Sequence, residues 1–338
     1  MLILSCLGVQ EFSAQSASWK QTVLGGICFK PAPENIFTGI APVVVDTPPL
    51  NPPADQCELW RTSEPVSSGI DGRVRFSITR ELLFGSIVMS ESGSEIIQGS
   101  TPLQHVTHIA VRDIFRVLDK HKFPHLLRVW NYFPDINLET AQLERYRQFN
   151  IGRQEGFEAS GRSLTVNVPA ACALGTGSGP LVIYFFAVRT PPLVIENPRQ
   201  VSAYHYPHQY GPRSPTFSRA VVSSAGEQEL LFVSGTASII GDRTMHHGDV
   251  VAQTRESLAN IDTVITAANR RVKRIPFAME SLHYKVYVRN ANHLEQVRAE
   301  VRRAVGSLAH VTFLQADICR SDLLVEVEAS AGHGLETG

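Results

Sequence analysis

The chain has 338 residues, and its 31 Lys and Arg nearly balance its 32 Asp and Glu, which gives a formal net charge of −1. This balance argues against a nucleic-acid binder that neutralises phosphates along a broad basic face. Hydrophobic residues make up 43% of the chain, which is enough for a packed core. The chain contains no run of 18 or more apolar residues, so the sequence predicts no membrane-spanning helix.

The N-terminal half shows a mixture of strand and helix patterns. Alternating apolar residues predict strands, and apolar residues spaced three and four apart predict helices. The expected elements are, in chain order, a buried strand within 1–9, a Pro-rich surface loop at 44–56, two strands within 73–90, a helix at 105–120, a polar helix at 138–158, a strand buried on both faces at 181–188 and a structured loop at 191–218.

The C-terminal half has a more regular pattern. Asp249 is the expected N-cap of its first helix, and Asn292 with Glu295 is expected to form a capping box for the second. The order β-β-α-β-α-β-β predicts an α+β fold, in which a sheet has both helices packed on one face. The expected elements are strands at 219–224 and 229–236, a helix at 250–269, a strand at 282–289, a helix at 293–308 and strands at 311–315 and 323–329.

The cysteines and histidines do not form a recognisable metal or redox motif. The five cysteines are widely spaced and contain no C-x-x-C pair, so we interpret them as thiols of a reducing, cytoplasmic compartment rather than a disulfide framework. Two pairs of histidines, His246 with His247 and His205 with His208, are candidate metal ligands. Neither pair has a carboxylate at ligand spacing, so we predict no metal ion. The glycine-rich run at 175–179 is followed by a strand, which favours a turn over a phosphate-binding loop.

Two strands in the C-terminal half place ionisable side chains on one face. Alternation puts Glu326 and Glu328 on the same face of the last strand. The pair is either a solvated edge or a cleft in which burial turns one carboxyl group into a proton donor. Lys285 and Tyr287 share one face of the strand at 282–289. This face either binds an anionic ligand or is the solvent-exposed polar face of the sheet.

Arginine and tyrosine side chains suggest a pocket for a small polyanion. The loop at 204–213 combines Tyr206 with Arg213, and Arg147 and Arg153 precede it in the chain. Guanidinium groups bind carboxylates through two parallel hydrogen bonds. Together these residues predict a site for a dicarboxylate.

Several short motifs, in the same order along the chain, resemble the chorismatase family over about residues 60–329, and the C-terminal half is also similar to the YjgF/RidA superfamily. The motifs are Trp130-Asn131-Tyr132, Ile136-Asn137, Tyr146-Arg147, Gly152-Arg153, Glu196-Asn197-Pro198, His205-Tyr206-Pro207, Tyr210-Gly211-Pro212-Arg213, His246-His247-Gly248-Asp249, Lys285-Val286-Tyr287-Val288-Arg289 and the run from Asp322 to Glu328.

The resemblance implies cleavage of chorismate into pyruvate and a ring product without a cofactor or metal. It assigns Glu326 as the acid that protonates the enolpyruvyl methylene, and it places Tyr146, Arg153, Tyr206 and Arg213 around the substrate. It further implies a YjgF/RidA-like, chorismate-mutase-like C-terminal domain at 191–330 and a related or divergent α+β domain at 1–190, with the active site between them. A monomer or a small homo-oligomer is expected.

Three further positions relate to the choice of product. In the water-adding branch of the family, the positions matching Gln200, Gly235 and Cys319 carry Val, Ala and Ala, so this chain resembles the branch that forms 3-hydroxybenzoate through an arene oxide. A chorismatase that releases a dihydroxycyclohexadiene carboxylate, or a mixture of 3- and 4-hydroxybenzoate, stays open. So does a non-catalytic YjgF-like small-molecule binding protein.

Overall fold

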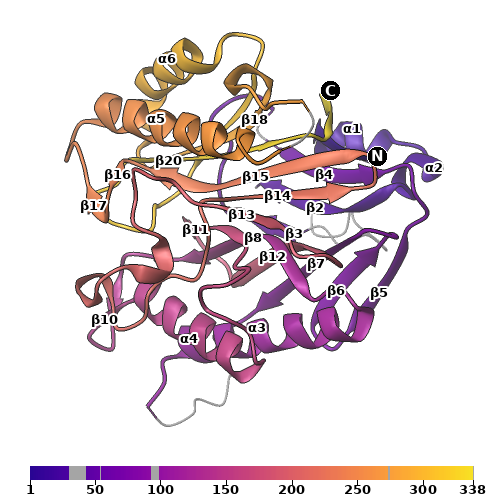
Figure 1. Cartoon of the computed structure of the whole chain (residues 1–338), viewed down its shortest axis with the longest axis horizontal. Helices are drawn as coiled ribbons and strands as arrows, with labels where there is room; N and C mark the ends of the chain where they lie inside the picture. Colours follow the sequence, from indigo (N-terminus) through magenta and orange to yellow (C-terminus); the bar gives the residue numbers. More distant parts are fainter. Residues whose placement is uncertain (30–42, 54, 93–98, 273–274, 338) are drawn as a thin grey trace.

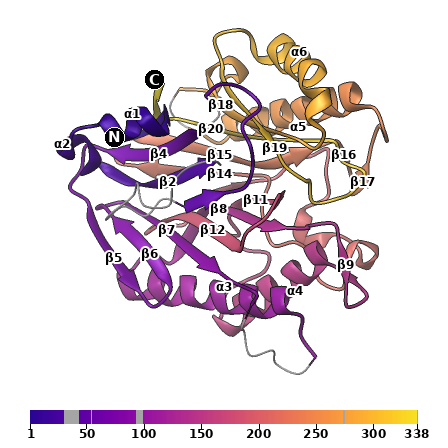
Figure 2. The ribbon, with the colours of Figure 1, turned by 180° about the vertical axis from the view of Figure 1, so that it is seen from behind.

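We describe the protein from a computed structural model that covers residues 1–29, 43–53, 55–92, 99–272 and 275–337. Within these residues, two six-stranded sheets and one five-stranded sheet lie between two pairs of helices (Figure 1). Helices α5 and α6 cover one outer face and α3 and α4 the opposite one, and the view from behind shows the same layers (Figure 2). No helix in the described ranges is long and apolar enough to cross a membrane.

The N-terminal segment forms the five-stranded sheet, in the order β21-β1-β4-β2-β3. The expected buried strand within 1–9 is confirmed as β1. Cys28 and Cys57 are joined by a disulfide bond between β2 and β4, so the interpretation of all five cysteines as unpaired thiols is wrong for these two. The elements are β1 (Leu2–Gly8), α1 (Val9–Ala14), α2 (Ala17–Lys20), β2 (Val23–Phe29), β3 (Val43–Val45), β4 (Gln56–Thr62) and, from the C-terminus, β21 (Gly334–Thr337).

The second sheet has the order β11-β8-β12-β7-β6-β5 and packs against α3 and α4. Helix α3 begins at Pro102, next to the N-cap Thr101, and its apolar side is buried. Every residue of β12 is buried, as predicted for a central strand covered on both faces. The elements are β5 (Ser67–Asp71), β6 (Val74–Ile78), β7 (Leu82–Met89), α3 (Pro102–His121), β8 (His125–Pro134), α4 (Arg145–Ala159), β11 (Ala170–Thr176) and β12 (Leu181–Val188).

The third sheet has the order β13-β14-β15-β20-β18-β19, and α5 and α6 pack on one face of it. This confirms the α+β arrangement expected for the C-terminal half. Asp249 caps α5 by accepting a hydrogen bond from the Ala252 amide. The elements are β13 (Leu193–Ile195), β14 (Ala220–Ala225), β15 (Gln228–Ala237), α5 (Val250–Asn269), β18 (His283–Val288), α6 (Leu294–Val305), β19 (His310–Gln315) and β20 (Val325–Ala331).

Four expectations about local structure need correction. The polar helix begins at Arg145 rather than at 138, because short strands precede it. The capping box of α6 is absent, since a 3-10 turn places His293 at the N-cap position and Asn290 caps that turn instead. The segment at 44–56 begins inside β3 and pairs with β19 through Pro49, and the segment at 191–218 contains β13. The remaining short elements are β9 (Glu139–Thr140), β10 (Leu143–Glu144), β16 (Ile239–Ile240), β17 (Arg243–Thr244), and the 3-10 turns Ala203–His205, His208–Tyr210, Met279–Ser281 and Ala291–His293.

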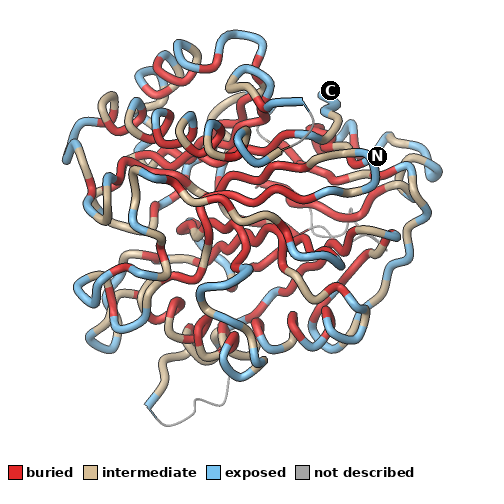
Figure 3. Tube along the Cα trace, viewed as in Figure 1, coloured by how far each residue is buried: buried red, intermediate tan, exposed pale blue. Residues whose placement is uncertain are grey.

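The strands of the three sheets are mostly buried, as the red segments in Figure 3 show, and aromatic side chains from them share one core. The ring centroids of Trp60 and Phe232 lie 5.9 Å apart, and those of Trp130 and Phe232 lie 6.1 Å apart. These residues come from all three sheets, so one core joins the two halves of the chain. Because the core is continuous across residue 190, it does not mark a boundary there, and the division into two domains at 1–190 and 191–330 stays a prediction.

Candidate active site

Glu326 lies on β20 opposite a break in the regular pairing of β15. The ladder register between β15 and β20 shifts between Val233 and Thr236, which leaves Gly235 in an irregular stretch. A Cβ atom built on Gly235 would lie 1.9 Å from Glu326 Oε1 and 3.0 Å from the Cβ of Cys172. Glycine at 235 therefore provides the space that the Glu326 carboxyl group occupies.

Burial changes the ionisation of Glu326. Its residue exposure is 3%, and desolvation, together with the negative charge of Glu328, raises the pKa of Glu326 to about 8. The interpretation of these two glutamates as a solvated edge is therefore wrong. A carboxyl group in this state holds its proton at neutral pH, as a general acid requires.

Glu328 carries the opposite charge state because its partners differ. It accepts hydrogen bonds from Arg128 and from Trp130 Nε1, and it forms an ion pair at 2.9 Å with Lys285 Nζ. The nearby positive charges of Lys285 and Arg128 outweigh desolvation and lower the pKa of Glu328. Lys285 Nζ also lies 2.8 Å from Glu58 Oε2, which extends this buried network to β4.

Glu326 forms part of the wall of a cavity of about 400 Å³. This volume suits a small organic molecule. A side pocket of about 30 Å³, lined by Arg153, Asn150, Cys172 and Thr216 among others, shares Glu326, Gly235 and Cys319 with it. The main cavity is lined by Glu144, Tyr146, Arg147, Tyr206, Gln209, Tyr210, Pro215, Phe217, Arg219, Gly235, Ala237, Ile239, Cys319, Arg320, Ser321, Asp322 and Glu326.

Arginine and tyrosine give the cavity its positive and aromatic character. The Arg320 guanidinium lies 4.0 Å from the centroid of the Tyr210 ring, and Arg219 Nη2 donates a hydrogen bond of 2.8 Å to the Tyr206 hydroxyl. Within the described residues, Arg219 Nε and Arg320 Nη2 are buried without a hydrogen-bond partner. Both nitrogens retain the capacity to donate to an anion.

The structure brings some of the predicted site residues to the cavity. Tyr146, Tyr206, Gly235, Cys319 and Glu326 line the main cavity, and Arg153 lines the side pocket and donates to the Thr216 carbonyl oxygen. Burial, with the neighbouring Glu326, raises the pKa of Cys319 to about 12, so its thiol is neutral.

Other predicted residues lie around the cavity rather than in its lining. Gln200 donates to the Ile239 carbonyl oxygen, and the half-exposed Arg213 contacts Gln154 and Glu158. Lys285 belongs to the Glu58–Glu328 network, and the hydroxyl groups of Tyr287 and Tyr132 lie 2.7 Å apart in the core. His246 and His247 pair with Glu256 and Asp322, as expected for hydrogen-bonded histidines.

Sequence reasoning missed the cavity arginines Arg219 and Arg320. Arg219 immediately precedes a strand, where a charged residue ordinarily indicates a solvated strand end. The sequence signal for Arg219 is Phe217, an aromatic residue two positions earlier that packs against its guanidinium group. Arg320 has no such local signal, because its aromatic partners Tyr206 and Tyr210 are distant in sequence.

Fold and site together define an α+β protein with a buried carboxylic acid at the wall of an arginine-lined cavity. Residues 58–187 match the family model described as "Chorismatase FkbO/Hyg5-like, N-terminal". A chorismatase of Streptomyces hygroscopicus is 38% identical over 276 residues, which is 80% of this chain and 78% of that protein. The chain belongs to the chorismatase family.

Two further comparisons agree with this assignment. A 3-hydroxybenzoate synthase of Streptomyces hygroscopicus is 41% identical and covers 66% of this chain and 68% of its own length. A crystal structure of a chorismatase is similar with a TM-score of 0.87 and 32% identity, and 98% of each chain is covered.

Proposed function

We propose that this protein cleaves chorismate into 3-hydroxybenzoate and pyruvate. The observation that supports this most directly is Glu326, a buried carboxylic acid with a pKa of about 8 at the wall of the cavity. An enol ether reacts by protonation at its methylene carbon, so it needs an acid that stays protonated at neutral pH. The relative named 3-hydroxybenzoate synthase supports the choice of ring product.

The cavity arginines are proposed to hold the two substrate carboxylates. Arg219 and Arg320 have buried nitrogens with no hydrogen-bond partner in the part of the chain that the structure describes, and Arg147 lines the same cavity. Tyr146 and Tyr206 would contact the ring. Arg153 lines the adjoining side pocket. Arg213 contacts Gln154 and Glu158 outside the lining, so we assign it a supporting role.

In the proposed reaction, Glu326 transfers its proton to the enolpyruvyl methylene. The C3–oxygen bond then breaks, and its electrons stay on the ether oxygen, which becomes the keto oxygen of pyruvate. The C4 oxygen attacks C3, and this new bond gives an arene oxide. The proton of the C4 hydroxyl group returns to Glu326. Opening of the C4–oxygen bond with loss of the C3 proton yields 3-hydroxybenzoate. No water is added, so the two products together equal chorismate.

Replacement of Glu326 tests the general acid. Glu326→Gln keeps the size of the side chain and removes its transferable proton, so pyruvate release should fall by about 10²–10⁴-fold. The control Glu295→Gln changes a glutamate on α6 whose side chain is 77% exposed, and it should behave as wild type. Turnover of Glu326→Gln near the wild-type rate would contradict the role of Glu326.

An isotope experiment tests the route to the ring product. When the reaction runs in oxygen-18 water, the 3-hydroxybenzoate should contain no label, because its phenolic oxygen is the C4 oxygen of the substrate. The keto oxygen of pyruvate exchanges with water and carries no information. Label in the ring product would show that water attacks C3 and would exclude the arene oxide.

A further inference from the structure

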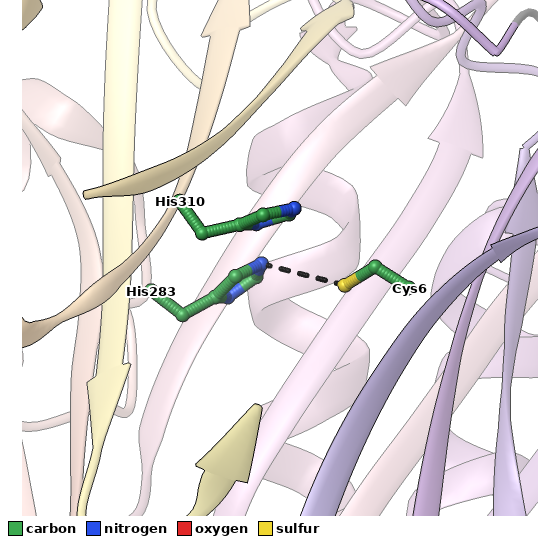
Figure 4. A group of neighbouring side chains, drawn as sticks. All are labelled: Cys6, His283 and His310. Carbon is green, nitrogen blue, oxygen red and sulfur yellow. Dashed lines mark hydrogen bonds between the residues drawn. The ribbon is translucent and has the colours of Figure 1, made fainter. Parts of the chain in front are cut away.

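Three side chains that commonly bind metals meet away from the cavity, where β1 lies beside β18 and β19. Cys6 Sγ lies 3.9 Å from His283 Nε2, and one ligand atom each of Cys6, His283 and His310 fall within 4.8 Å of one another. The two imidazole rings stack with centroids 5.0 Å apart, and Figure 4 shows both rings directed toward the Cys6 sulfur.

A fourth group borders this cluster on the side of His283. Glu58 on β4 is the direct cross-strand partner of Cys6, and its Oε1 atom lies 3.9 Å from His283 Nε2. Glu58 is 2% exposed, and Oε1 is buried without a hydrogen-bond partner among the described residues, whereas Oε2 binds Lys285. This carboxylate oxygen therefore keeps its capacity to bind a cation beside His283.

The sheet register produces this arrangement. Cys6 and Glu58 are neighbours in the pairing of β1 with β4, and His283 and His310 are neighbours in the pairing of β18 with β19. Two pairs of adjacent side chains from two different sheets therefore face each other. One sulfur, two nitrogens and one oxygen from opposite sides are a donor set that zinc binds in tetrahedral sites.

The sequence predicts no metal ion, because these residues are far apart in the chain. From their placement in the fold we propose that Cys6, Glu58, His283 and His310 form a structural zinc site that joins the N-terminal sheet to the C-terminal sheet. Tetrahedral zinc with these donors places neighbouring ligand atoms about 3.4–3.6 Å apart. The two separations of 3.9 Å need to shrink by a few tenths of an ångström, and the wider ones, up to 4.8 Å among Cys6, His283 and His310, by about an ångström. A thiolate ligand selects zinc over magnesium or calcium.

The site supplies negative charge to a divalent cation, which a buried site requires. The Cys6 thiolate offsets one positive charge, and the Glu58 carboxylate, which it shares with Lys285, offsets part of the other. On binding, the Cys6 thiol releases its proton to solvent and the sulfur donates an electron pair, so no oxidant or reductant is needed. Four protein ligands leave no open position, which makes the site structural rather than catalytic.

Metal analysis of the untagged full-length chain tests the proposal. We expect about one zinc per chain by mass spectrometry, and substitution by cobalt(II) should produce a thiolate-to-cobalt absorption band. Both Cys6→Ser and His310→Ala should lose the zinc and the band. His310 is only partly buried, so His310→Ala is the variant best suited to remain folded.

Two matched variants serve as controls. His333 lies 6.5 Å from His283 between ring centroids, but both of its nitrogens are engaged, with Ser330 and the Gly334 carbonyl oxygen, so His333→Gln should retain zinc. Cys172→Ser removes another buried free thiol and should retain zinc as well.

A further measurement requires no substitution. Wild-type chain treated with a chelator should regain zinc and show a higher unfolding temperature when zinc is added. Wild-type protein without zinc, without a cobalt band and without this stabilisation would overturn the proposal. Full zinc content in both Cys6→Ser and His310→Ala would also overturn it.

Discussion

Glu326 and Glu328 are two residues apart on one strand face, yet their surroundings give them different protonation states. Glu328 is paired with Lys285 and Arg128, and these cations keep it ionised. Glu326 is buried beside that negative charge, so its pKa rises to about 8. The separation of the two pKa values allows one carboxyl group to donate a proton while the other anchors the core.

This separation predicts the pH dependence of the reaction. A raised pKa means that Glu326 is protonated below about pH 8, so kcat/KM for pyruvate release should stay level there and fall tenfold per pH unit above it. Glu328→Gln removes the neighbouring negative charge and should move this fall to lower pH. Rates measured from pH 6 to 10 in both proteins check the prediction, and an unmoved fall in the variant would contradict it.

We predict that substitutions at Gly235 and Cys319 change the ring product. In Gly235→Ala, the new methyl group would meet Glu326 Oε1 at 1.9 Å, so the carboxyl group must move, and a displacement of this size costs about 10²-fold in rate. Combined with Cys319→Ala, it should let water compete at C3, because a barrier change of about 1.4 kcal/mol shifts a product ratio tenfold.

Chromatography of the ring products measures this shift. The control Gly8→Ala adds a methyl group at an ordinary contact distance of 3.5 Å and should leave rate and product unchanged. A double variant that forms only 3-hydroxybenzoate at the wild-type rate would show that positions 235 and 319 do not control the branch.

At the scale of the elements, Arg289 at the end of β18 holds the segment that carries Cys319 and Arg320. Its guanidinium group donates to the carbonyl oxygens of Leu323, Ile318 and Arg320, and it pairs with Asp317. All of its nitrogens are therefore occupied by the segment between β19 and β20. The side chain positions one wall of the cavity instead of binding substrate.

Arg289→Lys tests this positioning role. Lysine keeps the charge but cannot make the same set of contacts, and the loss of one charged hydrogen bond, about 1.5 kcal/mol, corresponds to about a tenfold fall in kcat/KM. Because Cys319 moves with the segment, the fraction of diene product should also rise. The exposed Arg80→Lys should change neither quantity. A variant with an unchanged product ratio would limit Arg289 to a role in stability.

The elements also show where sequence reasoning succeeds. Helix α5 was predicted with its observed bounds, because Asp249 is a strong local cap and the apolar spacing is regular. Strand β8 was not predicted, since Arg128 and Asn131 interrupt its apolar pattern. These polar groups are paired with Glu328 and the Cys172 carbonyl oxygen, which are distant in sequence. Alternation placed Glu326 and Glu328 on one face, but only the packing of a second sheet shows that this face is inside.

At the scale of the whole molecule, the core holds the N-terminal sheet against both other sheets. Trp60 on β4 lies 5.2 Å from Phe186 and 5.9 Å from Phe232 between ring centroids. Cys28 and Cys57 lie instead in a separate apolar cluster with Val9, Phe12, Val23 and Leu59. The disulfide bond therefore stabilises a part of the fold that is distinct from the cavity.

This separation predicts that stability and activity respond differently to loss of the disulfide bond. A crosslink between residues 29 apart stabilises by about 3–4 kcal/mol through the entropy of the unfolded chain, which for a protein of this size corresponds to a fall of about 5 °C in Tm. The double variant Cys28→Ala, Cys57→Ala should show this fall and retain wild-type pyruvate release at 25 °C. Reductant should lower the Tm of the wild type but not that of the variant.

Thiol titration checks that the bond forms. The denatured wild type should have three free thiols, Cys6, Cys172 and Cys319, before reduction and five after it. Five thiols before reduction would show that the bond does not form.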